Sequence, residues 1–237
     1  MDVNTEIMAA WLNSAKLARK ADNMQQAYNA VHHSTMLSKP LTAVEHAKLL
    51  WHEGQHKIAI RNLNGAIAKK ILEIGTEAPV NHSVTTSTSV STESEKQQPL
   101  KNLRVAKAKL LLAKWLEASG QTRSMDLMEK YRDASRWYIR WEQGHYFLGR
   151  YYNKLYEFEE GQDQAKQSPM YLDGEHARLI VQCYLRALQF GVKYIFQTMP
   201  RLLTVWLDLG DVVESNPPTN TKDPYVHIAI KIMNIAN

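Results

Sequence analysis

The chain repeats one local pattern, in which two amphipathic helical stretches are separated by a short polar or glycine break. In the first pair the break is Asp22–Asn23, and small or aromatic residues recur at helical spacing on its two sides: Trp11, Ala15, Ala18, Ala27, Ala30 and Val31. Further pairs break at Gly54 and Gly120, and positions 23 and 54 are 31 residues apart (54 − 23). This interval is close to the repeat of about 34 residues in tetratricopeptide proteins. The pattern predicts an all-α fold, an α-solenoid of tetratricopeptide- or HEAT-like helical hairpins.

The composition agrees with a helical intracellular protein. Glycine and proline are few, 10 and 8 in 237 residues, and no alternating apolar and polar run of strand length stands out. The single cysteine, Cys183, lies in an apolar run, so we expect a core residue and no disulfide framework. The chain begins with no signal peptide pattern and has no uncharged stretch of about 20 residues, which predicts a soluble protein without a membrane partner.

The charge does not indicate nucleic-acid binding. The formal net charge is +5, but the 29 basic residues are interleaved with 24 acidic ones. Solvated helix faces explain this better than a basic stripe does. We therefore expect no direct nucleic-acid site.

Four regions are predicted along the chain. Residues 1–75 and 101–212 carry the hairpin repeats, and residues 213–237 a loop and an apolar helix, Val226–Ile235, cut off by the chain end. Between the repeats, Thr76–Leu100 has 10 Ser or Thr in 25 residues and too few apolar groups to offset the entropy of ordering. It is predicted to be a disordered insertion, and whether its hydroxyls are phosphorylated stays open.

A fourth hairpin is predicted to turn near Gly144. The helix that follows is rich in aromatic residues at three- and four-residue spacing: Tyr146, Phe147, Tyr151, Tyr152, Tyr156 and Phe158. Such residues fill the grooves between stacked helices more often than they form a base-stacking platform, so we expect them in the core. A further helix is predicted to begin near Tyr171 and to end at Gly191.

The stretch Gly191–Gly210 has apolar residues at helical spacing, yet Pro200 stands in its middle without an N–H to donate. The sequence therefore predicts that one helix ends near Gln197. A second helix would begin with Thr198 as a cap and Pro200 in its first turn, where the missing donor costs little. Pro200 would then mark a hinge or corner.

One motif matches a zinc peptidase pattern. His52, Glu53 and His56 fit HExxH, with Glu73 downstream as a conceivable third ligand. That chemistry needs both histidines one turn apart on a continuous helix. Because Gly54 occupies the break of a hairpin, the histidines are predicted to lie on different helices, and we reject a metal site.

No other constellation supports catalysis or cofactor binding. Asp208–Leu209–Gly210 is similar to the metal-binding Asp-x-Gly of kinases, but no catalytic Asp and Asn pair, Gly-rich loop or lysine-bearing strand accompanies it. It is interpreted as a helix end. Gly144–Arg150 lacks the Lys and Ser or Thr of a phosphate loop. Glu157, Glu159 and Glu160 are expected to face solvent rather than to form an acid–base pair.

Several short runs nevertheless carry specific identities. Around Pro200 these are Tyr194, Gln197, Thr198, Met199, Pro200, Arg201, Leu202, Leu203, Thr204, Trp206, Leu207 and Asp208, and upstream they are Trp141, Glu142, Gly144, His145 and Tyr151–Leu155. In order and identity they resemble the FAT region of the phosphatidylinositol-3-kinase-related protein kinases, in particular the fungal-like ATR type. The resemblance is strong over Met125–Val212 and weaker over Trp11–Ala68.

The resemblance implies a function that the composition does not. The whole protein would be a nuclear Ser/Thr kinase of the DNA-damage and replication checkpoint and of DNA repair, responding to single-stranded DNA. Its partners would be an ATRIP-like protein, a second copy in a homodimer and the rest of the kinase chain. ATP and Mg²⁺ would bind only in a kinase domain that these residues do not contain, so this chain alone would be inactive.

One other function stays open at this point, whereas the predicted break at Gly54 argues against a zinc peptidase. A free-standing tetratricopeptide-type adaptor would bind a peptide in its groove, and it predicts exposed Lys, Arg or Asn residues on a concave face. A zinc peptidase would require His52 and His56 to bind one metal ion.

Overall fold

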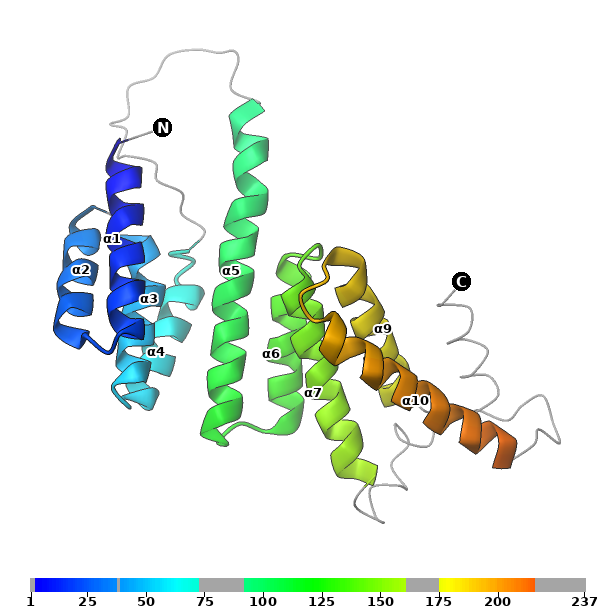
Figure 1. The fold of residues 1–237 in the computed structure, drawn as a ribbon. Coiled ribbons are helices and arrows are strands. Elements are labelled where there is room, and N and C mark those ends of the chain that lie inside the picture. The colour runs from blue at the N-terminus through cyan, green and yellow to red at the C-terminus, as the bar shows by residue number, and fades with distance from the viewer. Residues whose placement is uncertain (1–2, 38, 73–91, 161–174, 216–237) are drawn as a thin grey trace. The chain divides into compact units, whose positions relative to one another are not determined.

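The structure is a computed structural model that describes residues 3–37, 39–72, 92–160 and 175–215. It divides into two compact units, Met1–Lys130 and Tyr131–Asn237. Every regular element of the described residues is a helix (Figure 1), and the first four helices form two hairpins, as the sequence predicts. None of these helices combines the length and apolar character that a membrane span requires.

The first hairpin joins α1 (Val3–Lys20) to α2 (Met24–Leu37). Asp22 adopts a left-handed conformation with φ of 59°, which reverses the chain within three residues. Asn23 then caps α2, because its Oδ1 accepts a hydrogen bond from the backbone N–H of Gln26 at 3.2 Å. The predicted break at Asp22–Asn23 is confirmed.

Small residues allow α1 and α2 to pack closely. Ala15 and Ala27 are fully buried, and they form one cluster with Leu49 from the next helix. Trp11 differs from the expectation, because it remains 37 % exposed and stacks on His33 of α2, with ring centroids 4.7 Å apart. An indole at this position covers the edge of the hairpin instead of filling its core.

The second hairpin joins α3 (Lys39–His52) to α4 (His56–Ala68). Gly54 lies at the predicted break with φ of 81°, a conformation that favours glycine. The N–H of Gln55 returns to the carbonyl of Leu50 at 2.9 Å and closes the end of α3. This hairpin also agrees with the prediction.

The next helix, α5 (Thr92–Ser119), packs against α4. The rings of Trp51 and Trp115 stack in parallel, with centroids 4.6 Å apart and an interplanar angle of 1°. Because α5 begins at Thr92, it extends into the segment that the sequence predicts as disordered up to Leu100. This end of the segment is rich in Glu, Lys and Gln, which favour helix. The remainder of that insertion lies outside the described residues.

The chain reverses again at Gly120, with φ of 65°, before α6 (Ser124–Trp137). The second unit then continues with α7 (Glu142–Glu160), α9 (Glu175–Phe190) and α10 (Ile195–Ser215). α9 packs along α7 and also contacts α10 (Figure 1). The large side chains that are fully buried in the second unit are Tyr131, Tyr152, Ile180, Thr198 and Val205. The region predicted as loop and terminal helix after Ser215 lies outside the described residues.

Gly144 does not form the turn that the sequence predicts. The turn lies between Trp137 and Glu142, and Gly144 is buried in the first turn of α7. A Cβ atom there would lie 3.3 Å from both the Cα of Ser135 and the ring of Trp141. The position therefore requires a small residue for close helix approach rather than for chain reversal.

The predicted helix break at Pro200 is wrong. α9 ends at Phe190, the chain turns over residues 191–194, and α10 runs through Pro200 and Gly210 to Ser215. Pro200 removes only the bond that its N–H would donate to the carbonyl of Phe196, one turn earlier. Thr198 is no cap either, since its buried hydroxyl donates to the carbonyl of Tyr194 at 2.9 Å. The corner is thus the turn before α10, and Pro200 lies inside a continuous helix.

Candidate functional site

The residues of the HExxH pattern do not converge. His52 ends α3 and His56 begins α4, as predicted. The Nδ1 atom of His52 lies 3.7 Å from the carboxylate of Asp22, whereas the ring of His56 packs on Trp51 with centroids 4.2 Å apart. Glu53 accepts the hydroxyl hydrogen of Tyr28 at 2.7 Å. Glu73 lies outside the described residues.

The described part of the chain has no group of three or more His, Cys, Asp or Glu residues placed to hold a metal ion. The two segments similar to kinase motifs are helical in the structure. Asp208–Gly210 lies inside α10, which continues past the predicted helix end, and Gly144–Arg150 lies inside α7. Neither segment forms the loop that cradles a phosphate.

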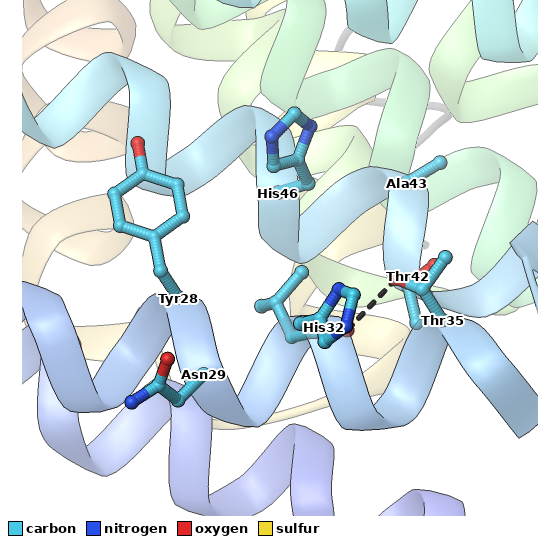
Figure 2. A pocket seen from close by; sticks show the side chains of 8 residues that line it. Tyr28, Asn29, His32, Thr35, Thr42, Ala43 and His46 are labelled. Carbon is cyan, nitrogen blue, oxygen red and sulfur yellow. Dashed lines mark hydrogen bonds between the residues drawn. The ribbon is translucent and has the colours of Figure 1, made fainter.

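A pocket of about 460 Å³ opens between α2 and α3 in the first unit (Figure 2). Its lining consists of Tyr28, Asn29, Val31, His32, Thr35, Thr42, Ala43 and His46. The lining contains exposed Asn29 but no Lys or Arg, so it matches only one of the three residue types that a tetratricopeptide-type adaptor predicts. The hydroxyl of Thr35 is already bonded to the carbonyl of Val31 at 2.8 Å. Burial and the Glu53 carboxylate raise the pKa of Tyr28 to about 12, so its phenol stays neutral.

We call the residues that carry the resemblance to the FAT region the signature residues. Two of them, Glu142 and Tyr194, meet where α10 begins, in the second unit. Three contacts fix Tyr194, the residue before α10. Its backbone N–H donates to the Oε1 atom of Glu142 at 3.0 Å, and its hydroxyl accepts from the Nε2 atom of Gln143 at 2.5 Å. Its ring stacks on Tyr146, with centroids 4.0 Å apart and an interplanar angle of 10°. We call these four residues the α10 anchor.

The anchor suits the electrostatics of a helix end. The first N–H groups of a helix lack partners within the helix and carry partial positive charge. The Glu142 carboxylate accepts from one backbone N–H immediately before this end. Gly191 allows the carboxylate to approach, because a Cβ atom at position 191 would overlap the Glu142 side chain.

A second set of contacts holds the next turns of α10 to α7. The Nε atom of Arg201 donates to the Oδ1 atom of Asn153, and its Nη2 atom lies 3.3 Å from the Oε1 atom of Glu157. The Nδ2 atom of Asn153 donates to the same Glu157 oxygen at 2.9 Å. Glu157 is exposed to solvent, as predicted, and it is also the charge partner of Arg201. The side chains of Glu159 and Glu160 lie outside the described residues.

Two signature tyrosines belong to the core, as predicted. Tyr151 stacks on Tyr131 with centroids 5.1 Å apart, and the hydroxyl of Tyr152 accepts a bond from Arg132 at 2.8 Å. Trp141 is half-buried against Gly144. These signature residues therefore hold α6, α7 and α10 together, and none of them is placed for chemistry.

Burial favours the neutral form of three titratable groups of this core, Cys183, Tyr184 and His145. Burial raises the pKa of Cys183 and of Tyr184 to about 12 in each case. Burial also lowers the pKa of His145, whose Nε2–H donates to the carbonyl of Ile139 at 2.7 Å. A raised thiol pKa is the opposite of what a nucleophilic cysteine requires. The prediction that Cys183 is a core residue is confirmed.

Sequence reasoning missed Gln143 and the contact role of Glu142. Their partner Tyr194 is 51 and 52 positions away, so no local spacing reveals the pairing. The only available signal was that Glu142 directly follows Trp141 and precedes Gly144 in the resemblance. Gln197, Met199, Pro200 and Trp206 are exposed on α10, unlike the buried Tyr151 and Tyr152. The side chain of Asp208 lies outside the described residues.

The geometry supports a structural role, and comparison with known proteins identifies the family. The FAT domain matches residues 1–204. Protein kinase rad3 of Schizosaccharomyces pombe is 35% identical over 203 residues, which cover 84% of this chain and 8% of that protein. The serine/threonine-protein kinase ATR of Arabidopsis thaliana is 25% identical over 241 residues, which cover 93% of this chain and 9% of that protein.

The serine/threonine-protein kinase MEC1 of Candida albicans is 26% identical over 200 residues, covering 84% of this chain and 7% of that protein. The chain thus spans less than a tenth of the length of each of these three relatives. The chain belongs to the FAT domain family, as the FAT region of an ATR-type phosphatidylinositol-3-kinase-related protein kinase.

Proposed function

We propose that this chain is the helical scaffold of an ATR-type Ser/Thr kinase that acts in DNA-damage and replication checkpoint signalling and in DNA repair. In this role it supports the kinase domain and regulates it. The observation that carries the proposal is the FAT match over residues 1–204, together with the contact between the signature residues Glu142 and Tyr194 in the α10 anchor.

The α10 anchor supplies a physical route for regulation. Helical hairpins contact mainly their neighbours, so a solenoid flexes as a spring, and its curvature biases an attached domain between states. The direction of α10 depends on a rigid corner, because Tyr194 is bonded through its backbone, its hydroxyl and its ring. Loosening this corner would decouple α10 from α7 and weaken the transmitted bias.

The partners and the location follow from the family. We propose that the full-length protein is nuclear, binds an ATRIP-like partner and forms a homodimer, and that ATP and Mg²⁺ bind in its kinase domain. The chain itself would contribute protein contacts and no catalytic group. The lining of the pocket between α2 and α3 has Asn29 but no Lys or Arg, and so gives the adaptor alternative little support.

Cell survival under replication stress tests the checkpoint role. Cells whose only copy of the full-length kinase carries Tyr194→Ala should lose viability on hydroxyurea, while Val192→Ala cells should behave as wild type. Val192 is the matched control because it lies in the same turn and is 74 % exposed. Protein level and nuclear location are measured in both strains. Full hydroxyurea resistance in Tyr194→Ala cells would contradict the proposal.

A further inference from the structure

One face of α10 is apolar and uncovered. It consists of Phe196, Met199, Leu203, Trp206 and Leu207, which are 87 %, 44 %, 59 %, 43 % and 64 % exposed. We call these five residues the α10 apolar face. At about 100° per residue they occupy a single stripe about 100° wide, which is the width a helix normally buries.

The opposite side of α10 is already packed. Thr198 and Val205 are 0 % and 1 % exposed and lie about half a turn from the stripe. A helix that is apolar on both sides requires a partner on each side. The α10 apolar face therefore needs an occupant beyond the described residues.

The chain itself offers an occupant with a matching pattern. Ile228, Ile232 and Ile235 are separated by four and then three residues. Read in the reverse direction, Leu203, Met199 and Phe196 are also separated by four and then three. Two antiparallel helices with these spacings bring the residues together as three facing pairs. In the same antiparallel register, Tyr225 would lie opposite Trp206.

We propose that residues 225–235 form a helix that packs antiparallel on the α10 apolar face in this register. As a helix the segment places His227, Lys231 and Asn234 on one narrow polar stripe and leaves the rest apolar. A helix of this length is marginal in water without tertiary packing. The same contact therefore covers α10 and stabilises the segment.

The chain between Ser215 and Ile228 is long enough to bring the segment onto the α10 apolar face. Ser215 and Leu203 are about 18 Å apart along α10, and packed helices lie about 10 Å apart, so the path from Ser215 to Ile228 is about 20 Å. The 13 intervening peptide steps span up to about 40 Å. The Pro217–Pro218 pair and the polar residues after it suit a connecting loop rather than a continued helix.

A second copy of the chain is the weaker occupant. The five side chains expose on the order of 500 Å² in total, below the roughly 800 Å² per partner of a stable protein interface. A tethered segment acts at a millimolar effective concentration and loses no translational freedom on binding. The inference does not depend on the proposed function.

Cysteine pairs in the full chain test the register. Cys183 is the only cysteine, so Cys183→Ala provides a cysteine-free background. Met199→Cys with Ile232→Cys forms a facing pair, and Met199→Cys with Asn234→Cys is the control, because position 234 lies on the far side of the new helix. Circular dichroism and thermal melting of the reduced proteins establish that both variants fold as the background does.

Under mild oxidation the facing pair should form an intramolecular disulfide about tenfold faster than the control pair, at a rate independent of protein concentration. Equal rates for the two pairs would overturn the register. Covalent dimers that increase with concentration would overturn the occupant in favour of a second copy. If neither pair is oxidised in the folded protein, the segment does not cover α10 and the inference fails.

Discussion

The ring of Tyr194 lies parallel to the ring of Tyr146, 4.0 Å away, although the two residues are 48 positions apart in the sequence (194 − 146). This stack joins the residue before α10 to the second turn of α7. Two hydrogen bonds fix Tyr194 as well: Gln143 donates to the Tyr194 hydroxyl, and the Tyr194 backbone N–H donates to Glu142. These three contacts of Tyr194 set the direction of α10.

Tyr194→Ala should destabilise the second unit. It removes the stack and the bond from Gln143, which together amount to about 2–3 kcal/mol of unfolding free energy. Tyr194→Phe keeps the stack and should cost only about 1 kcal/mol. Urea denaturation followed by tyrosine fluorescence and circular dichroism measures both. Equal losses for Ala and Phe would show that the stack contributes nothing.

Two glycine substitutions should have opposite effects. A Cβ at position 149 would lie 2.9 Å from the ring of Tyr184 and 3.0 Å from the Cβ of Cys183, so Gly149→Ala should cost about 1–3 kcal/mol through overpacking. Gly65 on α4 has no atom within 4 Å of such a Cβ, so Gly65→Ala should be neutral or stabilise by up to about 1 kcal/mol. Midpoints of thermal unfolding distinguish the two, and similar shifts would contradict the close approach of α7 and α9.

His145 should make the second unit sensitive to acid. Burial lowers its folded pKa below the unfolded value of about 6.5, with a smaller contribution from Arg186. The unfolded state therefore binds the proton more strongly, and stability falls as the pH drops below about 6.5 until it passes the folded pKa. Above about pH 7.5 this group should have no effect on stability.

His145→Gln removes this titration. Denaturation at pH 7.5 and pH 5.5 should show a smaller loss of stability for His145→Gln than for the wild type over the same interval. The comparison of the two losses cancels any constant cost of the substitution, including the lost stack on Phe190. Identical losses in the two proteins would exclude His145 as the source.

Cys183 should resist alkylation in the folded chain. Burial raises its thiol pKa to about 12, so almost no thiolate is present at pH 8. Iodoacetamide labelling should be at least about a hundredfold slower in buffer than in 8 M urea. Labelling at similar rates, read by mass spectrometry, would show that α9 is not packed on α7 as described.

Local signals predicted the hairpins well. Spacing of small residues indicated the α1–α2 pair, and the breaks at Gly54 and Gly120 are confirmed by their left-handed conformations. The corner before α10 was misplaced, because the Glu142 carboxylate that fixes it comes from another helix 52 positions earlier. The predicted turn at Gly144 failed for a similar reason. A glycine is needed there because the backbone of Ser135 lies close, and local sequence does not reveal that contact.

In the proposed function, the α10 anchor transmits the state of the scaffold to a kinase domain. Purified full-length kinase carrying Tyr194→Ala, Tyr194→Phe or Val192→Ala should be assayed for substrate phosphorylation with and without single-stranded DNA and the proposed ATRIP-like partner. We predict that Tyr194→Ala loses most of the stimulation, Tyr194→Phe loses part of it and Val192→Ala none. Full stimulation in folded Tyr194→Ala kinase would contradict the claim.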